Sequence, residues 1–203
     1  MPDDDEMIEA YCVSCKTKVF MEEPTPVYTR RGAPGTRGVC PSCGSTVFRM
    51  GRTEAHSAIP KPSLENRPEA ARSRTRSVSP IMAFINYAPI DLMFARQLAA
   101  DLEKMGIPSW VEFDDNADQI QWASGVHPAF EECTHMVVVL SSDTLIGDQV
   151  RDDWETFQTM RKPVFIAQIA EVAVPDDLRR RPRYDFTSDY KTAFRQLIQE
   201  LMT

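Results

Sequence analysis

The 203-residue sequence lacks the segments that mark a membrane protein or an exported protein. No stretch approaches the ~20 consecutive apolar residues that a transmembrane helix needs, which excludes an integral membrane protein. The first ten residues, MPDDDEMIEA, are acidic and contain no apolar run, which argues against a secretory signal peptide. We therefore expect a cytoplasmic protein without a membrane partner.

Glycine is scarce, with eight residues in the chain and only three after position 80: Gly106, Gly125 and Gly147. Neither G-x-G-x-x-G nor G-x-x-x-x-G-K-[ST] occurs. These patterns bring backbone amides close to phosphates in dinucleotide-binding folds and in P-loop nucleotide hydrolases. Both classes are excluded.

Basic charge is scarce in the longest part of the chain. Residues 81–203 contain twenty acidic and eleven basic side chains, a net charge of −9, whereas residues 1–50 carry −1 and residues 51–80 carry +3. An acidic block repels phosphate groups, and a nucleic-acid-binding module at the N-terminus would be basic rather than near neutral. We therefore do not expect nucleic acid as a partner.

Four of the five cysteines form two C-x2-C pairs, Cys12 with Cys15 and Cys40 with Cys43. Reduced thiols without an export signal are better metal ligands than disulfide partners. Two such pairs complete the tetrahedral shell that zinc prefers, and Gly44 can take a positive φ that frees backbone amides to bond the sulfurs. The pattern predicts a small β zinc ribbon over residues 1–50.

The zinc ion is expected to be structural, because four ligands leave no open position for catalysis. A module of this size has too small a core to fold alone, so the energy of metal binding serves as folding energy. We also expect the ribbon to dock a protein partner. Residues 51–80, rich in serine and proline and poor in large apolar residues, predict a flexible linker.

From residue 81 onward, strand-like and helix-like patterns alternate. Apolar runs predict strands at 81–87, 109–113, 135–141, 163–169 and 183–186, and helical spacing predicts helices at 91–105, 122–132, 148–160 and 189–202. Alternation of this kind implies parallel strands joined by right-handed crossovers. The expected fold class is α/β, a flavodoxin-like doubly wound sheet of five parallel strands over residues 81–203.

Several short motifs occur in this region in a characteristic order. Residues 84–87 read FINY, 106–108 read GIP, 137–141 read VVVLS and 162–164 read KPV, with Asp114-Asp115 after the second strand. Their order and spacing resemble those of Toll/interleukin-1 receptor (TIR) domains, especially bacterial ones, in which the acidic pair would open the BB loop. The resemblance covers essentially all of 81–203.

This resemblance implies two alternative functions. Many bacterial and plant TIR domains hydrolyse the nicotinamide–ribose bond of NAD+ on self-assembly, as immune effectors, and others act only as signalling scaffolds. We expect a TIR effector that self-associates and uses NAD+ as its substrate. The alternative is a catalytically weak adaptor that oligomerises and recruits partners.

The resemblance also implies site residues. The catalytic glutamate of the family aligns with Asp153, and Val150 stands where the family often has cysteine. Aspartate keeps the charge but is one methylene shorter, and a displacement of ~1 Å can lower a rate about 100-fold. The other reading of Asp153 is an acid favoured by the helix dipole. The substrate-binding residues implied in the same way are Asn86, Tyr87, Trp122 and Ser141.

Overall fold

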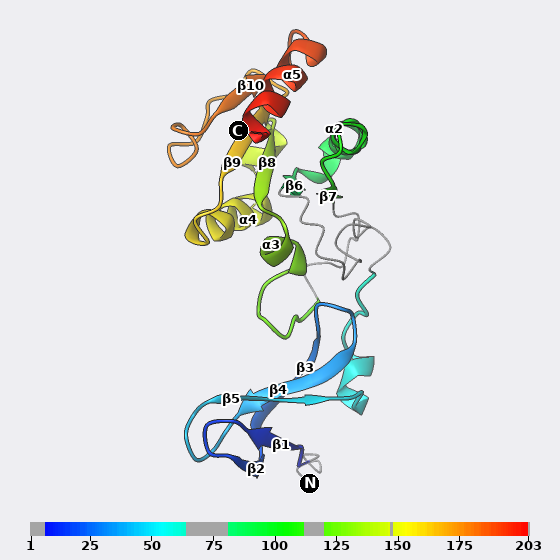
Figure 1. Ribbon diagram of the computed structural model, residues 1–203, viewed down its shortest axis with the longest axis vertical. Helices are drawn as coiled ribbons and strands as arrows, with labels where there is room; N and C mark the ends of the chain where they lie inside the picture. Colours follow the sequence, from blue (N-terminus) through cyan, green and yellow to red (C-terminus); the bar gives the residue numbers. More distant parts are fainter. Residues whose placement is uncertain (1–6, 64–80, 112–119, 147, 203) are drawn as a thin grey trace. The chain divides into compact units, whose positions relative to one another are not determined.

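The computed structural model describes residues 7–63, 81–111, 120–146 and 148–202, and these form two compact units (Figure 1). The first, the ribbon unit, comprises Met1–Glu65 together with Asp114–Pro128. The second, the α/β unit, comprises Asn66–Phe113 together with Ala129–Thr203. A segment from the middle of the chain therefore folds with the N-terminal residues.

The ribbon unit is built from two small antiparallel sheets. Strands β1 (Glu9–Cys12) and β2 (Thr17–Phe20) form a hairpin, and β3 (Glu22–Tyr28), β4 (Pro34–Val39) and β5 (Thr46–Met50) form a sheet in the order β3-β4-β5. Strand β3 contains two prolines, which a strand tolerates at the edge of a sheet. Around the cysteines, the core consists of few side chains: Ile8, Ala10, Met21 and Val47, with Cys12 and Cys40.

A short helix follows this sheet, inside the span expected to be linker. Helix η1 (Glu54–Ser57) buries His56, which is 1% exposed. The Nε2 atom of His56 lies 3.0 Å from the carbonyl oxygen of Gly35, and its Nδ1 atom accepts from the backbone N–H of Thr53. These contacts fix residues 54–57 against the sheet, whereas residues 64–80 of the predicted linker lie outside the described residues.

The α/β unit contains the predicted five-stranded parallel sheet. Its order is β10-β9-β8-β6-β7, formed by β6 (Ala83–Asn86), β7 (Ser109–Val111), β8 (His135–Leu140), β9 (Val164–Gln168) and β10 (Arg183–Asp185). Every neighbouring pair is parallel. The expected α/β, doubly wound fold class is thus confirmed.

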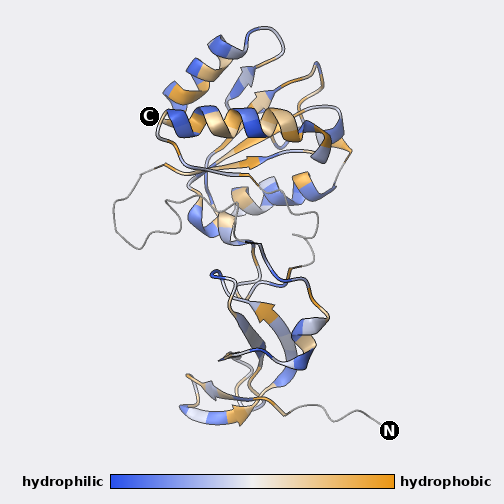
Figure 2. Cartoon of the chain, turned by 90° about the vertical axis from the view of Figure 1, so that its right-hand side faces the viewer, coloured by the Kyte–Doolittle hydropathy of each residue, from blue (hydrophilic) through white to orange (hydrophobic). Residues whose placement is uncertain are grey.

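Amphipathic helices cover both faces of this sheet (Figure 2). Helices α2 (Leu92–Lys104) and α5 (Tyr190–Leu201) bury leucines and alanines against β6, β8 and β9 in one core cluster. On the other face lie α3 (Pro128–Glu132) and α4 (Asp148–Thr159), where the ring of Phe130 contacts those of Phe84 and Phe157. The described helices include none that is long and apolar enough to span a bilayer.

The short turns η2 (Pro89–Asp91) and η4 (Asp143–Leu145) follow β6 and β8 at the carboxyl edge of the sheet. Helix α3 is shorter than the sequence predicts by a whole turn or more, because it begins at Pro128 rather than near Trp122. The backbone at Trp122 forms a parallel bridge to Tyr28 instead, so extended pairing with β3 replaces the first turns of the expected helix.

Candidate functional site

The four cysteines of the two C-x2-C pairs lie together in the ribbon unit. All four sulfur atoms lie within 4.8 Å of one another, with 3.6 Å between Cys12 and Cys43 and 3.9 Å between Cys15 and Cys40. A tetrahedral ion with ~2.3 Å bonds to sulfur places its ligands about 3.8 Å apart. The cluster therefore has the size of a tetrathiolate metal site, and these residues could hold one metal ion.

The two turns that carry the cysteines share a backbone device. The residue after each C-x2-C pair has a positive φ, 55° at Lys16 and 70° at Gly44. The positive φ predicted for Gly44 is confirmed. In the first turn the backbone N–H of Cys15 points to the sulfur of Cys12 at 3.4 Å, an N–H···S contact that stabilises a thiolate ligand. Lysine fills this conformation less readily than glycine, and for that reason the sequence signals only one of the two turns.

Hydrogen bonding within the cluster spreads the thiol pKa values. Hydrogen bonds from the side chain and backbone of Ser45 lower the pKa of Cys43 to about 6. Contacts with the sulfurs of Cys43 and Cys12 raise the pKa of Cys15 to about 12. At neutral pH Cys43 is therefore largely a thiolate, whereas Cys15 holds a proton that a metal ion must displace, which makes metal binding weaker as the pH falls.

A second group of polar side chains lies at the carboxyl edge of the parallel sheet, where open α/β folds bind their ligands. Asn86, the last residue of β6, is 3% exposed, and its amide Nδ2 donates to the carbonyl oxygen of Val150 at 2.8 Å. This bond joins the end of β6 to the first turn of α4. Tyr87 follows, half-buried, and packs against the core.

Ser141 joins two further elements at this edge. It is buried directly after β8, and its hydroxyl donates to Asp91 Oδ2 at 2.6 Å. The hydroxyl of Thr144 lies 3.1 Å from the hydroxyl oxygen of Ser141 and donates to the carbonyl oxygen of Val139. The serine therefore connects η4 to η2, the turn that precedes α2.

Asp153 lies on the partly buried side of α4. Of the four acids in this helix, Asp148, Asp152 and Glu155 are exposed, and Asp153 alone is partly buried. It lies three residues after buried Val150 and four before buried Phe157, which places the three on adjoining positions of the helix surface. The side-chain amide of Gln149 donates to Asp153 Oδ1 at 3.3 Å.

Trp122, the fourth expected substrate residue, belongs to the ribbon unit. It is 8% exposed and clusters with Tyr28 and Ile120, and its ring meets that of His127 edge-on at 5.3 Å. Its indole Nε1 is buried without a hydrogen-bond partner. Asn86, Tyr87, Ser141 and Asp153 thus all lie in the α/β unit, where Asn86 bonds the α4 backbone at Val150, whereas Trp122 has its contacts in the ribbon unit.

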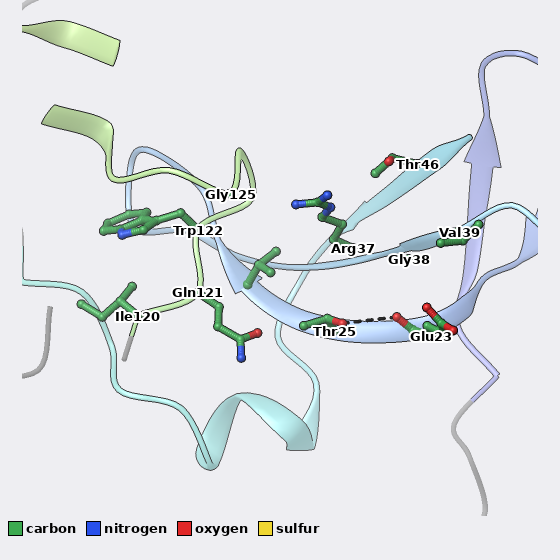
Figure 3. A pocket seen from close by; sticks show the side chains of 11 residues that line it. Glu23, Thr25, Arg37, Gly38, Val39, Thr46, Ile120, Gln121, Trp122 and Gly125 are labelled. Atoms are coloured by element: carbon green, nitrogen blue, oxygen red, sulfur yellow. Dashed lines mark hydrogen bonds between the residues drawn. The ribbon is translucent and has the colours of Figure 1, made fainter. Parts of the chain in front are cut away.

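Beside Trp122 the ribbon unit contains a cavity of about 420 Å³ (Figure 3). Residues of β3, β4 and β5 form one wall, and the segment after position 119 forms the other. No sequence signal marked this cavity, because its walls come from segments about 80 residues apart. It is lined by Glu23, Thr25, Val27, Arg37, Gly38, Val39, Thr46, Ile120, Gln121, Trp122 and Gly125.

The parallel order of the strands defines the class of the second unit, a doubly wound α/β domain with polar side chains at the carboxyl ends of β6 and β8. Residues 83–198, more than half of the chain, match the family model of the TIR domain. The chain therefore belongs to the TIR domain family, and it is a protein of TIR-domain signalling.

Other comparisons cover further parts of the chain. Residues 11–50, which contain the four clustered cysteines, match a domain of unknown function (DUF5679). Among solved structures, the TIR domain of the Toll-related receptor TRR-2 from Hydra magnipapillata is 21% identical, with a TM-score of 0.49 over 60% of this chain and 98% of that one. No curated protein shows significant similarity to the chain.

Proposed function

We propose that the TIR domain hydrolyses the nicotinamide–ribose bond of NAD+ and that Asp153 is its catalytic carboxylate. The observation that carries this proposal is the position of Asp153, the partly buried acid of α4 beside Val150. A carboxylate at the margin of a buried face is held in place and partly shielded from water, unlike an acid placed only to favour the helix dipole.

Hydrolysis of the nicotinamide–ribose bond requires few catalytic groups besides this carboxylate. Breaking the bond builds positive charge on the ribose in an oxocarbenium-like transition state, and nicotinamide leaves as a neutral molecule. A fixed carboxylate stabilises that charge and orients the ribose hydroxyl or the attacking water. In this proposal the bond from Asn86 to Val150 holds the first turn of α4, and with it Asp153, against the end of β6.

The other proposed substrate contacts lie at the same carboxyl edge of the parallel sheet. Tyr87 supplies an aromatic face directly after Asn86, and Ser141 fixes the turn after β8 through Asp91. Trp122 contributes to the substrate site only when its ring leaves the cluster with Tyr28, because a buried ring cannot stack on a ligand.

A specific observation favours a second candidate function, a signalling scaffold. The side chains of Asn86 and Ser141 are both engaged in bonds within the protein, and aspartate is shorter than the glutamate of the family pattern. TIR domains commonly self-associate or bind other TIR domains, and a scaffold needs only that property. We propose self-association for both candidates, as the step that completes the site in the first and as the whole function in the second.

We further propose that the four cysteines hold Zn2+ as a structural ion. The spacing of their sulfurs fits a tetrahedral shell, and four thiolates suit zinc. A reducing compartment such as the cytoplasm keeps these thiols available. Metal analysis of the purified protein tests this, with one zinc per chain as the expected result.

The enzyme proposal is tested by the release of nicotinamide from NAD+, measured by chromatography at high protein concentration. Asp153→Ala should abolish the release, and the matched variant Asp152→Ala, which removes an exposed acid from the same helix, should retain it. Equal loss in both variants, or none in either, would contradict the role of Asp153. No release by the wild type in its self-associated form would favour the scaffold.

A further inference from the structure

Within the ribbon unit, the sheet β3-β4-β5 (the ribbon sheet) binds residues 120–123 by strand addition. The backbone N–H of Tyr28, at the end of edge strand β3, donates to the carbonyl oxygen of Gln121 at 2.7 Å. The N–H of Ala123 donates back to the carbonyl oxygen of Tyr28 at 2.8 Å. Trp122 and Tyr28 thus form a parallel bridge, the pattern by which an extended segment extends an open sheet edge.

The side chains of this segment follow the alternation of a strand. Ile120 and Trp122 are buried, and Gln121 between them is exposed. The two buried residues pack on Tyr28, with Ile59 at the margin of the cluster. Behind Tyr28, the ring of His56 meets the tyrosine ring edge-on at 5.7 Å, so the receiving surface is held from within the ribbon unit.

We propose that the ribbon sheet is an intramolecular clamp that holds residues 120–123 and controls when they are free. Residues 120–123 fall inside the 83–198 match to the TIR family model, whereas Tyr28 falls inside the 11–50 match to a different model. The clamp therefore connects two modules that separate family models describe. This assigns the protein partner of the ribbon to the chain itself.

Few interactions hold residues 120–123 on the ribbon sheet, so this contact can open. Two backbone hydrogen bonds and one small apolar cluster hold the segment, and the indole N–H of Trp122 is buried without an acceptor. A buried donor without a partner destabilises the closed state relative to an open state in which water satisfies it. The cavity beside residues 120–123 also leaves one side of this segment without close packing. Of the side chains across the cavity, the guanidinium of Arg37 extends toward Gly125 (Figure 3). Contacts of this kind open at low cost.

The metal site and the clamp share one strand. Strand β4 begins at Pro34, which pairs with Tyr28, and it ends at Val39, directly before the cluster residue Cys40. A metal ion bound at Cys40 therefore holds the end of β4, and β4 is the strand that pairs with Tyr28 of β3. Loss of the metal loosens the clamp and frees residues 120–123. The freed segment then serves association between copies, a consequence that rests on the self-association proposed above.

Hydrogen exchange with mass spectrometry on the full metal-loaded chain tests the clamp without any assay of NAD+. Ile120→Asp places a charge in the cluster, and exchange at the amides of Tyr28 and Ala123 should accelerate at least tenfold. The matched control, Ile146→Asp, changes an isoleucine that is 80% exposed in the α/β unit and should leave both amides protected. Amides of β8 serve as the internal reference for the fold of each variant.

The results of this experiment distinguish failure of the clamp from failure of the proposed function. Fast exchange of both amides in the wild type, or unchanged exchange in Ile120→Asp with β8 intact, would overturn the clamp. Loss of protection on dilution of the wild type would also overturn it, because the pairing would then join two copies. Sedimentation of the same samples, with and without a zinc chelator, should show stronger association when the clamp is open. A chain that clamps but does not hydrolyse NAD+ would contradict only the proposed function.

Discussion

Removal of the proposed zinc ion should unfold the ribbon unit and leave the α/β unit folded. Around the cysteines, the ribbon core contains three large apolar side chains, Ile8, Met21 and Val47. At ~1.5–3 kcal/mol each, their burial contributes about 5–9 kcal/mol. A structural zinc ion contributes ~10–16 kcal/mol at neutral pH. The ion is therefore the larger stabilising contribution, and the core alone does not replace it.

The perturbation is Cys40→Ser, because Cys40 is 1% exposed and lies 3.9 Å from the sulfur of Cys15. Metal content should fall to near zero, and amides of β1 to β5 should exchange at rates close to those of an unfolded chain. Cys133→Ser is the matched control, since this buried cysteine lies in the α/β unit outside the cluster, and it should keep the metal. Protected ribbon amides in metal-free Cys40→Ser would refute the reasoning.

The remaining predictions concern single contacts. The hydrogen bond from Lys104 is the main cause that lowers the pKa of Asp101 to about 2. This carboxylate therefore stabilises the folded state above pH ~4 and loses that effect as the pH falls toward 2. In Asp101→Asn, the stability of the α/β unit, measured by urea unfolding, should change less with pH over that range. Gly38→Ala places a Cβ 2.7 Å from a carbonyl oxygen of β3, and we expect ~1–3 kcal/mol of destabilisation, seen as release of metal at lower chelator concentration. Trp154→Phe removes the 2.7 Å bond from the indole to Asp177 and should cost about 1.5–3 kcal/mol, with thermal unfolding as the readout and an unchanged melting temperature as the contrary result.

The parts of the fold that sequence predicts are those set by local pattern. The run at 135–141 is apolar on both faces of a strand, and the structure buries Met136 to Leu140 completely in the centre of the sheet. The C-x2-C spacing fixes two sulfurs in each turn, so only the meeting of the two turns depends on the fold. These predictions succeeded because the signal and the structure lie within a few residues of each other.

The parts that sequence does not predict depend on partners far along the chain. Residues 120–122 carry a strand-like alternation of buried and exposed residues, but they are too few to outweigh the helical reading without knowledge of Tyr28. His56 lies in a serine- and proline-rich stretch, and only its bond to Gly35 shows that it is structural. The internal bonds of Asn86 and Ser141 likewise join residues at least 50 positions apart.

The proposed role of Asp153 as the catalytic carboxylate is tested most directly by the rates of NAD+ consumption of the wild type, Asp153→Glu and Asp153→Ala in their self-associated form. We expect the wild type to release nicotinamide and Asp153→Glu to be at least as active, because it restores the longer side chain. The rate of Asp153→Ala should be lower by a factor of about 100 or more, on the order expected for a lost positioned group. Activity in Asp153→Glu alone would contradict the claim and mark the natural aspartate as a site that no longer catalyses.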